Sequence, residues 1–355
     1  MDIYVTVDKD LVAASNGLLQ SVTEANERKT YHWRTVNSIN NYAISFNIGP
    51  FELITDTFES VYGNEFDLVY YHLPRDDDKA QQLFDEIPDM LNFYERVIGP
   101  YPFSNEKVGV VESPHLGMEH QTINAYGNNY KKDGYGFDFI LHHEFSHEYF
   151  GNQLTNDNYD DLWLHEGFGS YMQPLFAQHS IGERAIQSYL QTHRENLINK
   201  FPLVSDKILN NDEVYKSEIG PASDVYSKGA LVVHTLRELI GDPAFFSVIS
   251  EVVYGTSDPK PGMFKPRFSN TNEFIQIVNK TTGMNYQWFF DVYLYQAELP
   301  VLLQKREPSK LILSWKTPED LTFPMPLEVS INGSLKTLVM QSEEVIQVQP
   351  KDVVI

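Results

Sequence analysis

The chain has 355 residues, of which 42% are hydrophobic and 13% aromatic, so it is globular rather than disordered and long enough for two or three domains. Its formal net charge of −22 argues against nucleic acid or an anionic membrane as a partner. It has no cysteine, so it forms no disulfide, and a zinc site would have to use histidine and carboxylate ligands.

The first 55 residues are predicted to form strands joined by turns. Apolar residues alternate in part over residues 2–7, and Asn16-Gly17 is a strong turn signal between two apolar runs. Met1 is followed by neither a basic nor an apolar signal segment. No apolar run reaches the length of about 18 residues that indicates a membrane-spanning helix, so no membrane insertion is expected.

The next segment is predicted to alternate strands with a helix. Residues 66–72 and 107–111 are short and rich in β-branched or aromatic side chains, which is typical of strands. Between them, the apolar residues of 83–94 recur at helical spacing, and Pro88 predicts a kink in that helix. The charge run 75–79 is interpreted as the solvated start of the same helix.

A series of helices is predicted to follow. Gly241 closes one helix and Asp242-Pro243 opens the next, since glycine favours the position after a helix end and proline the first turn. The expected helices cover residues 137–151, 160–179, 186–199, 223–240, 272–282 and 285–297, with residues 200–222 irregular and 255–270 a loop.

From residue 299 the apolar pattern changes to a period of two, as in strands. Leu311, Leu313 and Trp315 alternate with other residues, and Asn332-Gly333 predicts a two-residue hairpin turn. Residues 299–355 are therefore expected to form a small β-sandwich module, and residues 352–355 resemble the middle of a strand.

The strongest chemical signal is the sequence His143-Glu144-x-x-His147. In a helix, residues i and i+4 lie on one face, so the imidazoles of His143 and His147 can reach one metal ion. Glu144 points to a different side and can address a water molecule on that metal. His142 and His147 are five residues apart and fall on different faces, so His142 cannot replace His143 as the partner of His147 in binding one metal ion.

A third ligand candidate, Glu166, follows His147 after 18 residues. That spacing holds the rest of the first helix, a loop, and the start of a second helix for which Asp160 or Asp161 is the expected N-cap. Two antiparallel helices can therefore bring Glu166 to the metal. Two histidines and one carboxylate make a three-ligand zinc site with an open fourth position, as catalysis requires.

This ligand pattern resembles that of the gluzincins, and specifically the aminopeptidase N family of zinc metallopeptidases. The similarity includes the blocks at residues 163–168 and 225–230 and extends over roughly residues 30–300. It implies a thermolysin-like catalytic domain over residues 56–298, one zinc ion (Zn²⁺) per chain, and peptide substrates. Residues 1–55 resemble only the tail of the family's N-terminal β domain, and the family's helical C-terminal domain has no counterpart. We therefore expect the chain to be a fragment.

The resemblance also assigns roles to two further residues. Leu116-Gly117-Met118-Glu119-His120 matches in part the family's Gly-x-Met-Glu-Asn, whose glutamate binds the free amine of the substrate, so Glu119 takes that role. Leu116 and His120 depart from the pattern. Tyr226 matches the family tyrosine that donates its hydroxyl to the oxyanion. From the residues alone, Glu119 would be an ordinary edge-strand carboxylate and Tyr226 a packing residue.

The reaction implied is hydrolysis of the N-terminal peptide bond. Zinc would lower the pKa of its bound water to about 7, with Glu144 as general base and Tyr226 as oxyanion donor. A thermolysin-like zinc endopeptidase, which lacks an amine anchor, and a non-catalytic zinc-stabilised binding domain remain as alternatives; Glu119 argues against the first and Glu144 against the second. The remaining histidines considered are expected to be packing or surface residues: His142, His165, His179, His193 and His234.

Overall fold

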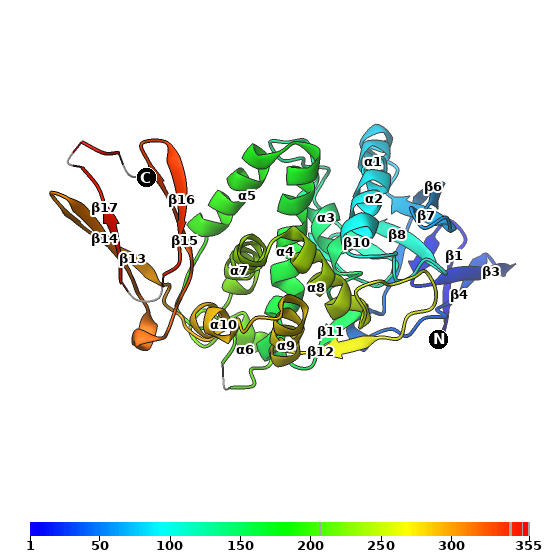
Figure 1. Ribbon diagram of the computed structural model, residues 1–355. Coiled ribbons are helices and arrows are strands. Elements are labelled where there is room, and N and C mark those ends of the chain that lie inside the picture. Colours follow the sequence, from blue (N-terminus) through cyan, green and yellow to red (C-terminus); the bar gives the residue numbers. More distant parts are fainter. Residues whose placement is uncertain (206, 341–342, 350, 354–355) are drawn as a thin grey trace.

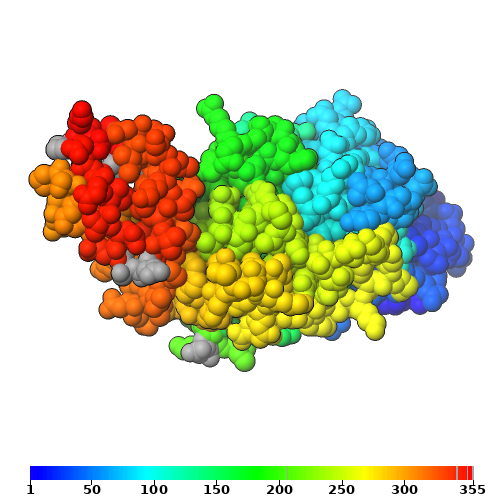
Figure 2. Space-filling view, in the orientation of Figure 1, coloured from blue at the N-terminus to red at the C-terminus, as the bar shows by residue number. Residues whose placement is uncertain are grey.

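The computed structural model describes residues 1–205, 207–340, 343–349 and 351–353 (Figure 1). This part of the chain combines several sheets with a set of helices, so the expected mixed α+β class is confirmed. The N-terminal strands lie at one end, the helices in the middle, and the C-terminal strands form a lobe at the other end (Figure 2). Among the described helices we find no candidate for a membrane-spanning segment.

Five N-terminal strands form two small antiparallel sheets, one with the order β1-β4-β3 and one pairing β2 with β5. They are β1 (Asp2–Asp8), β2 (Val12–Ser15), β3 (Leu18–Ala25), β4 (Arg28–Arg34) and β5 (Phe46–Gly49). The chain turns at Gly17 as predicted, with φ at 74°, and a Cβ there would lie 2.2 Å from the carbonyl oxygen of Arg34. Only glycine fits both the conformation and the space.

A five-stranded sheet with the order β6-β7-β8-β10-β9 lies beside these strands. Its members are β6 (Glu52–Glu59), β7 (Glu65–His72), β8 (Lys107–Glu112), β9 (Gly117–Met118) and β10 (Asn124–Tyr126). The three central strands β7, β8 and β10 run parallel, and β9 closes one edge in antiparallel pairing with β10. The predicted strand around Glu119 is therefore an edge strand, although it is only two residues long.

The single kinked helix predicted before β8 is wrong, because the structure has two helices there. α1 (Asp77–Phe84) ends before Pro88, and α2 (Ile87–Val97) contains Pro88 in its first turn. Proline is tolerated in a first turn because its missing N–H would have no helical partner there. Pro88 therefore starts a new helix instead of bending an existing one.

The predicted metal helix is α3 (Phe139–Ser146), which is shorter than the expected 137–151. It begins where it does because Asp138 has an extended backbone and its carboxylate accepts hydrogen bonds from the amides of Ile140 and Leu141, as an N-cap does. After Ser146 the helical bonding pattern is lost: the amides of Glu148 and Tyr149 donate three residues back, and the amide of Asn152 donates five residues back, to the His147 carbonyl at 2.8 Å.

The helix that carries Glu166 is α4 (Trp163–Ser180), and the predicted N-cap is wrong. Asp160 and Asp161 lie in a preceding 3₁₀ turn, Tyr159–Asp161, whose cap is Asn158. Asp161 instead accepts hydrogen bonds from the amide and the hydroxyl of Thr271, at 2.8 and 2.7 Å. Its other oxygen, Oδ2, accepts from the side-chain amide of Asn158 at 3.1 Å, so both oxygens bond outside α4.

Helix α7 (Asp224–Ile240) crosses α4 where two glycines meet. A Cβ on Gly167 would lie 2.9 Å from the Cα of Gly229, so only glycine permits this approach. Gly167 directly follows Glu166 and Gly229 is three residues from Tyr226. The close crossing therefore brings those two side chains to the same region.

The remaining predicted helices are all present, but most of their bounds differ from the expected ones. They are α5 (Glu183–Glu195), α8 (Asp242–Tyr254), α9 (Thr271–Thr282) and α10 (Gln287–Tyr293). The segment 200–222, expected to be irregular, contains the short helix α6 (Asn211–Val214). Two three-residue strands, β11 (Leu154–Asn156) and β12 (Arg267–Ser269), pair in parallel beside the helices.

The C-terminal strands form a three-stranded sheet, β13-β14-β17, and a two-stranded sheet, β15-β16. Their bounds are β13 (Val301–Glu307), β14 (Lys310–Lys316), β15 (Leu327–Ile331), β16 (Ser334–Leu338) and β17 (Glu343–Gln347). Leu311, Leu313 and Val329 belong to a hydrophobic core of their own. The hairpin predicted at Asn332-Gly333 is confirmed. Residues 352 and 353 are not in a strand, and residues 354–355 lie outside the described part.

Candidate metal centre and active site

Three of the predicted site residues converge on one point. The Nε2 atoms of His143 and His147 are 3.3 Å apart, and Glu166 Oε2 lies 3.6 Å from the first and 3.4 Å from the second. In a tetrahedral zinc site with bonds of about 2.0–2.1 Å, neighbouring ligand atoms are about 3.3 Å apart. The three atoms therefore form a triangle of the size that one face of a zinc coordination sphere requires.

The charge state of this cluster also suits a cation. All three side chains are buried, and Glu166 Oε2 has no hydrogen-bond partner among the described residues. Burial alone would raise the pKa of Glu166, but the close approach of the imidazoles, His147 foremost at 3.4 Å, outweighs it and holds that pKa below its ordinary value. Glu166 is therefore ionised, as a metal ligand must be. We conclude that the residues present fit a zinc ion.

Glu144 lies next to the cluster without belonging to the same triangle. It is buried on α3, and a carboxylate oxygen of Glu144 lies within 4.8 Å of a ligand atom of His147 and of Glu119. Burial raises the pKa of Glu144 to about 8. A carboxyl group that titrates near neutral pH can both take and return a proton, which is the property of a general base and acid.

Glu119 reaches the same point from the sheet edge. It directly follows β9, and Asn152 donates to its backbone carbonyl at 3.0 Å, which ties the edge to the turn after α3. Burial raises the pKa of the Glu119 carboxyl. The structure thus brings together the amine-binding candidate, the general-base candidate and the ligand cluster, although Leu116 and His120 depart from the family pattern.

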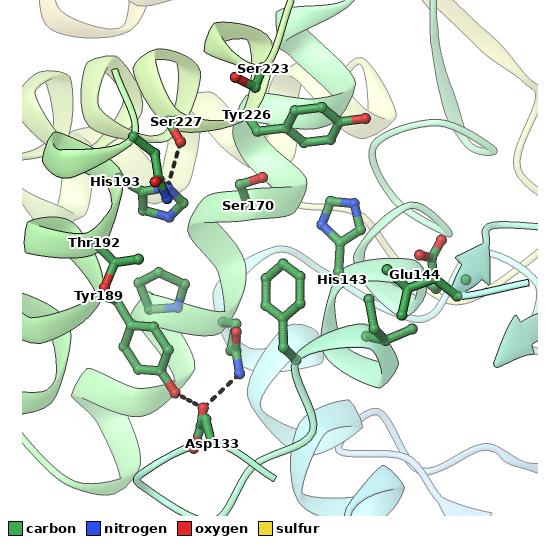
Figure 3. Close-up of a pocket in the computed structure, with 17 residues that line it drawn as sticks. Asp133, His143, Glu144, Ser170, Tyr189, Thr192, His193, Ser223, Tyr226 and Ser227 are labelled. Atoms are coloured by element: carbon green, nitrogen blue, oxygen red, sulfur yellow. Dashed lines mark hydrogen bonds between the residues drawn. The ribbon is translucent and has the colours of Figure 1, made fainter. Parts of the chain in front are cut away.

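Tyr226 lies on the other side of the cluster, in the first turn of α7. Its ring centroid is 6.0 Å from that of His143. Burial raises the pKa of the Tyr226 hydroxyl, with the charge of Glu166 as the next cause, so the hydroxyl keeps its proton and remains a hydrogen-bond donor. Figure 3 shows Tyr226, His143 and Glu144 around one open space.

Two cavities meet at these side chains, and His143, Glu144 and Tyr226 line both. One cavity, of about 620 Å³, contains Glu119 and the metal ligands; we call it the amine-side cavity. The other, of about 850 Å³, extends away from Glu119 between α3, α4 and α5 and is mostly apolar; we call it the leaving-side cavity. Figure 3 shows polar groups at its far end, where His193 bonds to Ser227 and Tyr189 to Asp133.

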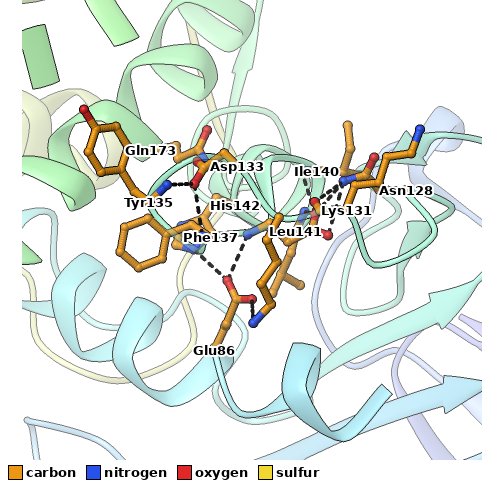
Figure 4. A network of polar contacts seen from close by, with 12 residues as sticks. Glu86, Asn128, Lys131, Asp133, Tyr135, Phe137, Ile140, Leu141, His142 and Gln173 are labelled. Carbon is orange, nitrogen blue, oxygen red and sulfur yellow. Dashed lines mark hydrogen bonds and ion pairs between the residues drawn. The ribbon is translucent and has the colours of Figure 1, made fainter. Parts of the chain in front are cut away.

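A polar network behind α3 holds the start of this helix (Figure 4). Glu86 accepts a hydrogen bond from the amide of Asp138 at 3.0 Å and pairs with Lys132 at 3.1 Å. His142 is fully buried in this region, with its Nε2 3.7 Å from the Glu86 carboxylate and its ring 4.7 Å from that of Phe176. His142 therefore faces away from the ligand cluster, as its register predicts.

The other histidines also lie outside the cluster. His165 is buried and its Nε2 accepts from the amide of Asn156 at 3.0 Å, while His179 is exposed. His234 contacts the hydroxyl of Tyr171 at 3.0 Å. His193 differs from the expectation of a packing or surface residue only in that it lines the leaving-side cavity.

Three tyrosines that line the amine-side cavity, Tyr42, Tyr159 and Tyr215, were not anticipated as site residues, and two of them approach charged groups of the site. Tyr42 comes from the N-terminal segment, and burial followed by the charge of Glu119 raises the pKa of its hydroxyl. Tyr215 comes from the segment predicted to be irregular and donates to Glu166 Oε1 at 3.1 Å. Neither is within a motif, and the chain has 21 tyrosines, so only tertiary contacts single them out.

Comparison with known proteins identifies the family of the chain. The sequence profile of the Peptidase family M1 domain matches residues 84–293, which is more than half of the chain. The chain therefore belongs to peptidase family M1, a family of zinc metallopeptidases, and its membership confirms the resemblance to the aminopeptidase N family.

The individual relatives share less than a quarter of their aligned residues with this chain. Human endoplasmic reticulum aminopeptidase 1 is 24% identical over 258 residues, which is 68% of this chain and 27% of that protein. Probable aminopeptidase 2 of Sulfurisphaera tokodaii is 22% identical over 365 residues, 96% of this chain and 45% of that protein. The chain thus spans less than half the length of either relative.

Solved structures show the same fold. An M1 zinc metallopeptidase from Deinococcus radiodurans has a TM-score of 0.68 at 24% identity, covering 84% of this chain and 64% of that one. Legionella pneumophila aminopeptidase A has a TM-score of 0.77 at 14% identity, covering 98% of this chain and 42% of that one.

Proposed function

We propose that this chain contains the catalytic part of a zinc-dependent aminopeptidase that removes the N-terminal residue of peptides. The observation that carries the proposal is the position of Glu119, whose carboxylate lies within 4.8 Å of Glu144 and His147. An endopeptidase has no need of a second free carboxylate there, whereas a substrate with a cationic α-amine can pair with it.

In this proposal His143, His147 and Glu166 hold one zinc ion per chain. The chemistry that zinc supplies when bound is activation of a water molecule and polarisation of the scissile carbonyl. Glu144 takes a proton from that water on its carboxylate and gives it to the nitrogen of the leaving amine. Because Glu144 lines both cavities, it can serve groups on either side of the scissile bond.

Tyr226 and Glu119 orient the substrate in the same scheme. The Tyr226 hydroxyl donates to the carbonyl oxygen as negative charge develops there, which lowers the barrier most if the donor is already in position. Glu119 pairs with the α-amine and so fixes the first peptide bond between the cavities. The first side chain then occupies the amine-side cavity, and the following residues occupy the leaving-side cavity.

We further infer the domain organisation. Residues 1–55 form the tail of an N-terminal β domain, residues 56–298 a thermolysin-like catalytic domain, and residues 299–355 a small β-sandwich module. The separate hydrophobic core of the C-terminal strands supports the last division. The N-terminal strands share their core with Val69, Tyr71 and Val111 of the adjoining sheet, so they pack directly on the catalytic part. The net charge of −22 supports peptides, rather than nucleic acid, as the partner.

A screen of aminoacyl-coumarin substrates, with and without a chelator, tests the proposed function. We expect release of coumarin that stops when zinc is removed and returns when zinc is restored. Release that persists in the chelated protein would contradict it.

A further inference from the structure

The two carboxylate oxygens of Glu166 have different partners. Oε2 faces the Nε2 atoms of His143 and His147, at 3.6 and 3.4 Å. Oε1 points away from them and accepts a hydrogen bond from the hydroxyl of Tyr215 at 3.1 Å. A tyrosine hydroxyl is protonated at neutral pH and donates, so this bond holds one oxygen while the other stays available for the metal.

The ring of Tyr215 contacts a second element of the proposed mechanism. It stacks on the ring of Tyr226, with centroids 6.3 Å apart and planes 25° from parallel. The ring of His143 is also near that of Tyr226, with centroids 6.0 Å apart. One side chain therefore contacts both a proposed metal ligand and the proposed oxyanion donor.

Tyr215 is presented by a turn that local contacts hold in place. The turn begins with a reciprocal cap, in which the side chain of Asn210 accepts from the Glu213 amide and that of Glu213 accepts from the Asn210 amide, both at 3.0 Å. Val214 is 1% exposed, and its carbonyl accepts from the amide of Ala222 at 2.9 Å. Tyr215 thus follows a fixed residue and needs little ordering to reach Glu166.

We infer that Tyr215 is a positioning residue of the metal centre, which fixes the carboxylate of Glu166 through its hydroxyl and the ring of Tyr226 through its own ring. The inference rests on the proposed function in one respect, namely that zinc occupies the cluster. Groups that hydrogen-bond to a ligand orient it before the metal arrives, and their loss typically weakens metal binding by about 10–100-fold.

The hydroxyl is tested by Tyr215→Phe, which keeps the ring. Zinc dissociation constants are measured without substrate, by competition with a chromogenic chelator, for the wild type, Tyr215→Phe and the control Tyr4→Phe. We expect the zinc dissociation constant to rise by about 10–100-fold in Tyr215→Phe and to stay unchanged in Tyr4→Phe. The thermal unfolding of the metal-free proteins should coincide, because a hydroxyl that only stabilised the fold would lower the unfolding temperature without zinc.

The ring is tested by comparing Tyr215→Leu with Tyr215→Phe at saturating zinc. We expect kcat to be about ten-fold lower in Tyr215→Leu than in Tyr215→Phe, with a smaller change in KM, because Tyr226 loses its support. In a Tyr226→Phe background the two variants should have equal kcat, since the hydroxyl that the ring positions is gone.

The outcomes separate this inference from the proposed function. If the wild type binds zinc and Tyr215→Phe binds it with the same constant, the role of the hydroxyl is contradicted and the aminopeptidase proposal stands. If the difference between Tyr215→Leu and Tyr215→Phe persists in the Tyr226→Phe background, the role of the ring is contradicted. If the wild type binds no zinc, both proposals are wrong.

Discussion

His147 donates from Nδ1 to the carbonyl oxygen of Phe150, 2.9 Å away. A carbonyl can only accept, so Nδ1 carries a proton, and in the neutral ring the lone pair is on Nε2, which faces Glu166. The bond is possible because α3 ends at Ser146 and the chain turns back on itself. The early end of this helix, which the sequence did not predict, thus orients His147, one of the proposed metal ligands.

If His143, His147 and Glu166 bind the zinc ion, removing one of these side chains should release it. His143→Ala and Glu166→Ala should each lose most of the bound zinc, because two ligands cannot replace three in a site with an open fourth position. Elemental analysis of the purified proteins measures this directly. His179→Ala, which removes an exposed histidine outside the cluster, is the matched control and should keep its zinc. Full zinc content in both ligand variants would refute the assignment.

Glu144→Gln should separate binding from chemistry. The carboxamide has nearly the same shape as the carboxylate but cannot accept the proton, so zinc content should remain normal while kcat falls by roughly 10²–10⁴-fold. Zinc analysis and steady-state kinetics on the same preparation give both quantities. A variant with near-normal kcat would exclude Glu144 from proton transfer.

Tyr226→Phe removes one hydroxyl and leaves the ring against His143 and Tyr215. We expect kcat to fall by roughly 10²–10³-fold, the size typical of one lost oxyanion donor, with a much smaller change in KM. The split between kcat and KM is the informative measurement. An unchanged kcat would mean that Tyr226 is a packing residue.

Lys107 predicts a pH dependence of stability. It is buried, its Nζ donates to the carbonyls of Ser15 and Gly17, and burial lowers its pKa from 10.5 to about 7. Between pH 7 and 10 the unfolded chain therefore binds more protons at this residue than the folded chain does. Over this range the free energy of unfolding should rise with pH, by at most about 1.4 kcal/mol per pH unit, and below pH 7 the contribution should be constant.

The measurement is urea unfolding of the wild type and Lys107→Met from pH 6 to 9. The difference in unfolding free energy between them should be flat near pH 6 and should increase in favour of the wild type above pH 7. Lys336→Met, at an exposed lysine, controls for the loss of one charge. A difference that stays constant over the whole range contradicts a neutral Lys107 in the folded chain.

The sequence predicted those parts of the site that depend on local spacing. His143 and His147 share a helix face whatever surrounds them, and Gly241 ends a helix because its φ of 79° suits glycine. Predictions failed where a distant contact decides the outcome. Asp161 looked like a cap but accepts from Thr271, 110 residues away, and Tyr215 reaches Glu166 across 49 residues. Neither partner can be read from neighbouring residues.

Assigning Glu119 and Tyr226 depended on resemblance to a family, because a single glutamate or tyrosine has no local signature. The structure supplies what spacing could not. The sheet edge brings Glu119 toward Glu144, and the glycine crossing of α4 and α7 brings Tyr226 toward Glu166. Both depend on how separate elements pack, which is the level at which prediction from a single sequence is weakest.

Paired peptides that differ only in N-terminal acetylation test the central claim most directly. Acetylation removes the cationic amine that Glu119 is proposed to bind and leaves every peptide bond in place. Mass spectrometry of the digests, with Glu119→Gln as the matched variant, reports both the site and the rate of cleavage. The account predicts loss of single residues from the free-amine peptides, little cleavage of the acetylated ones, and a large loss of free-amine cleavage in Glu119→Gln. Internal cleavage of acetylated and free peptides at similar rates would contradict it and indicate an endopeptidase.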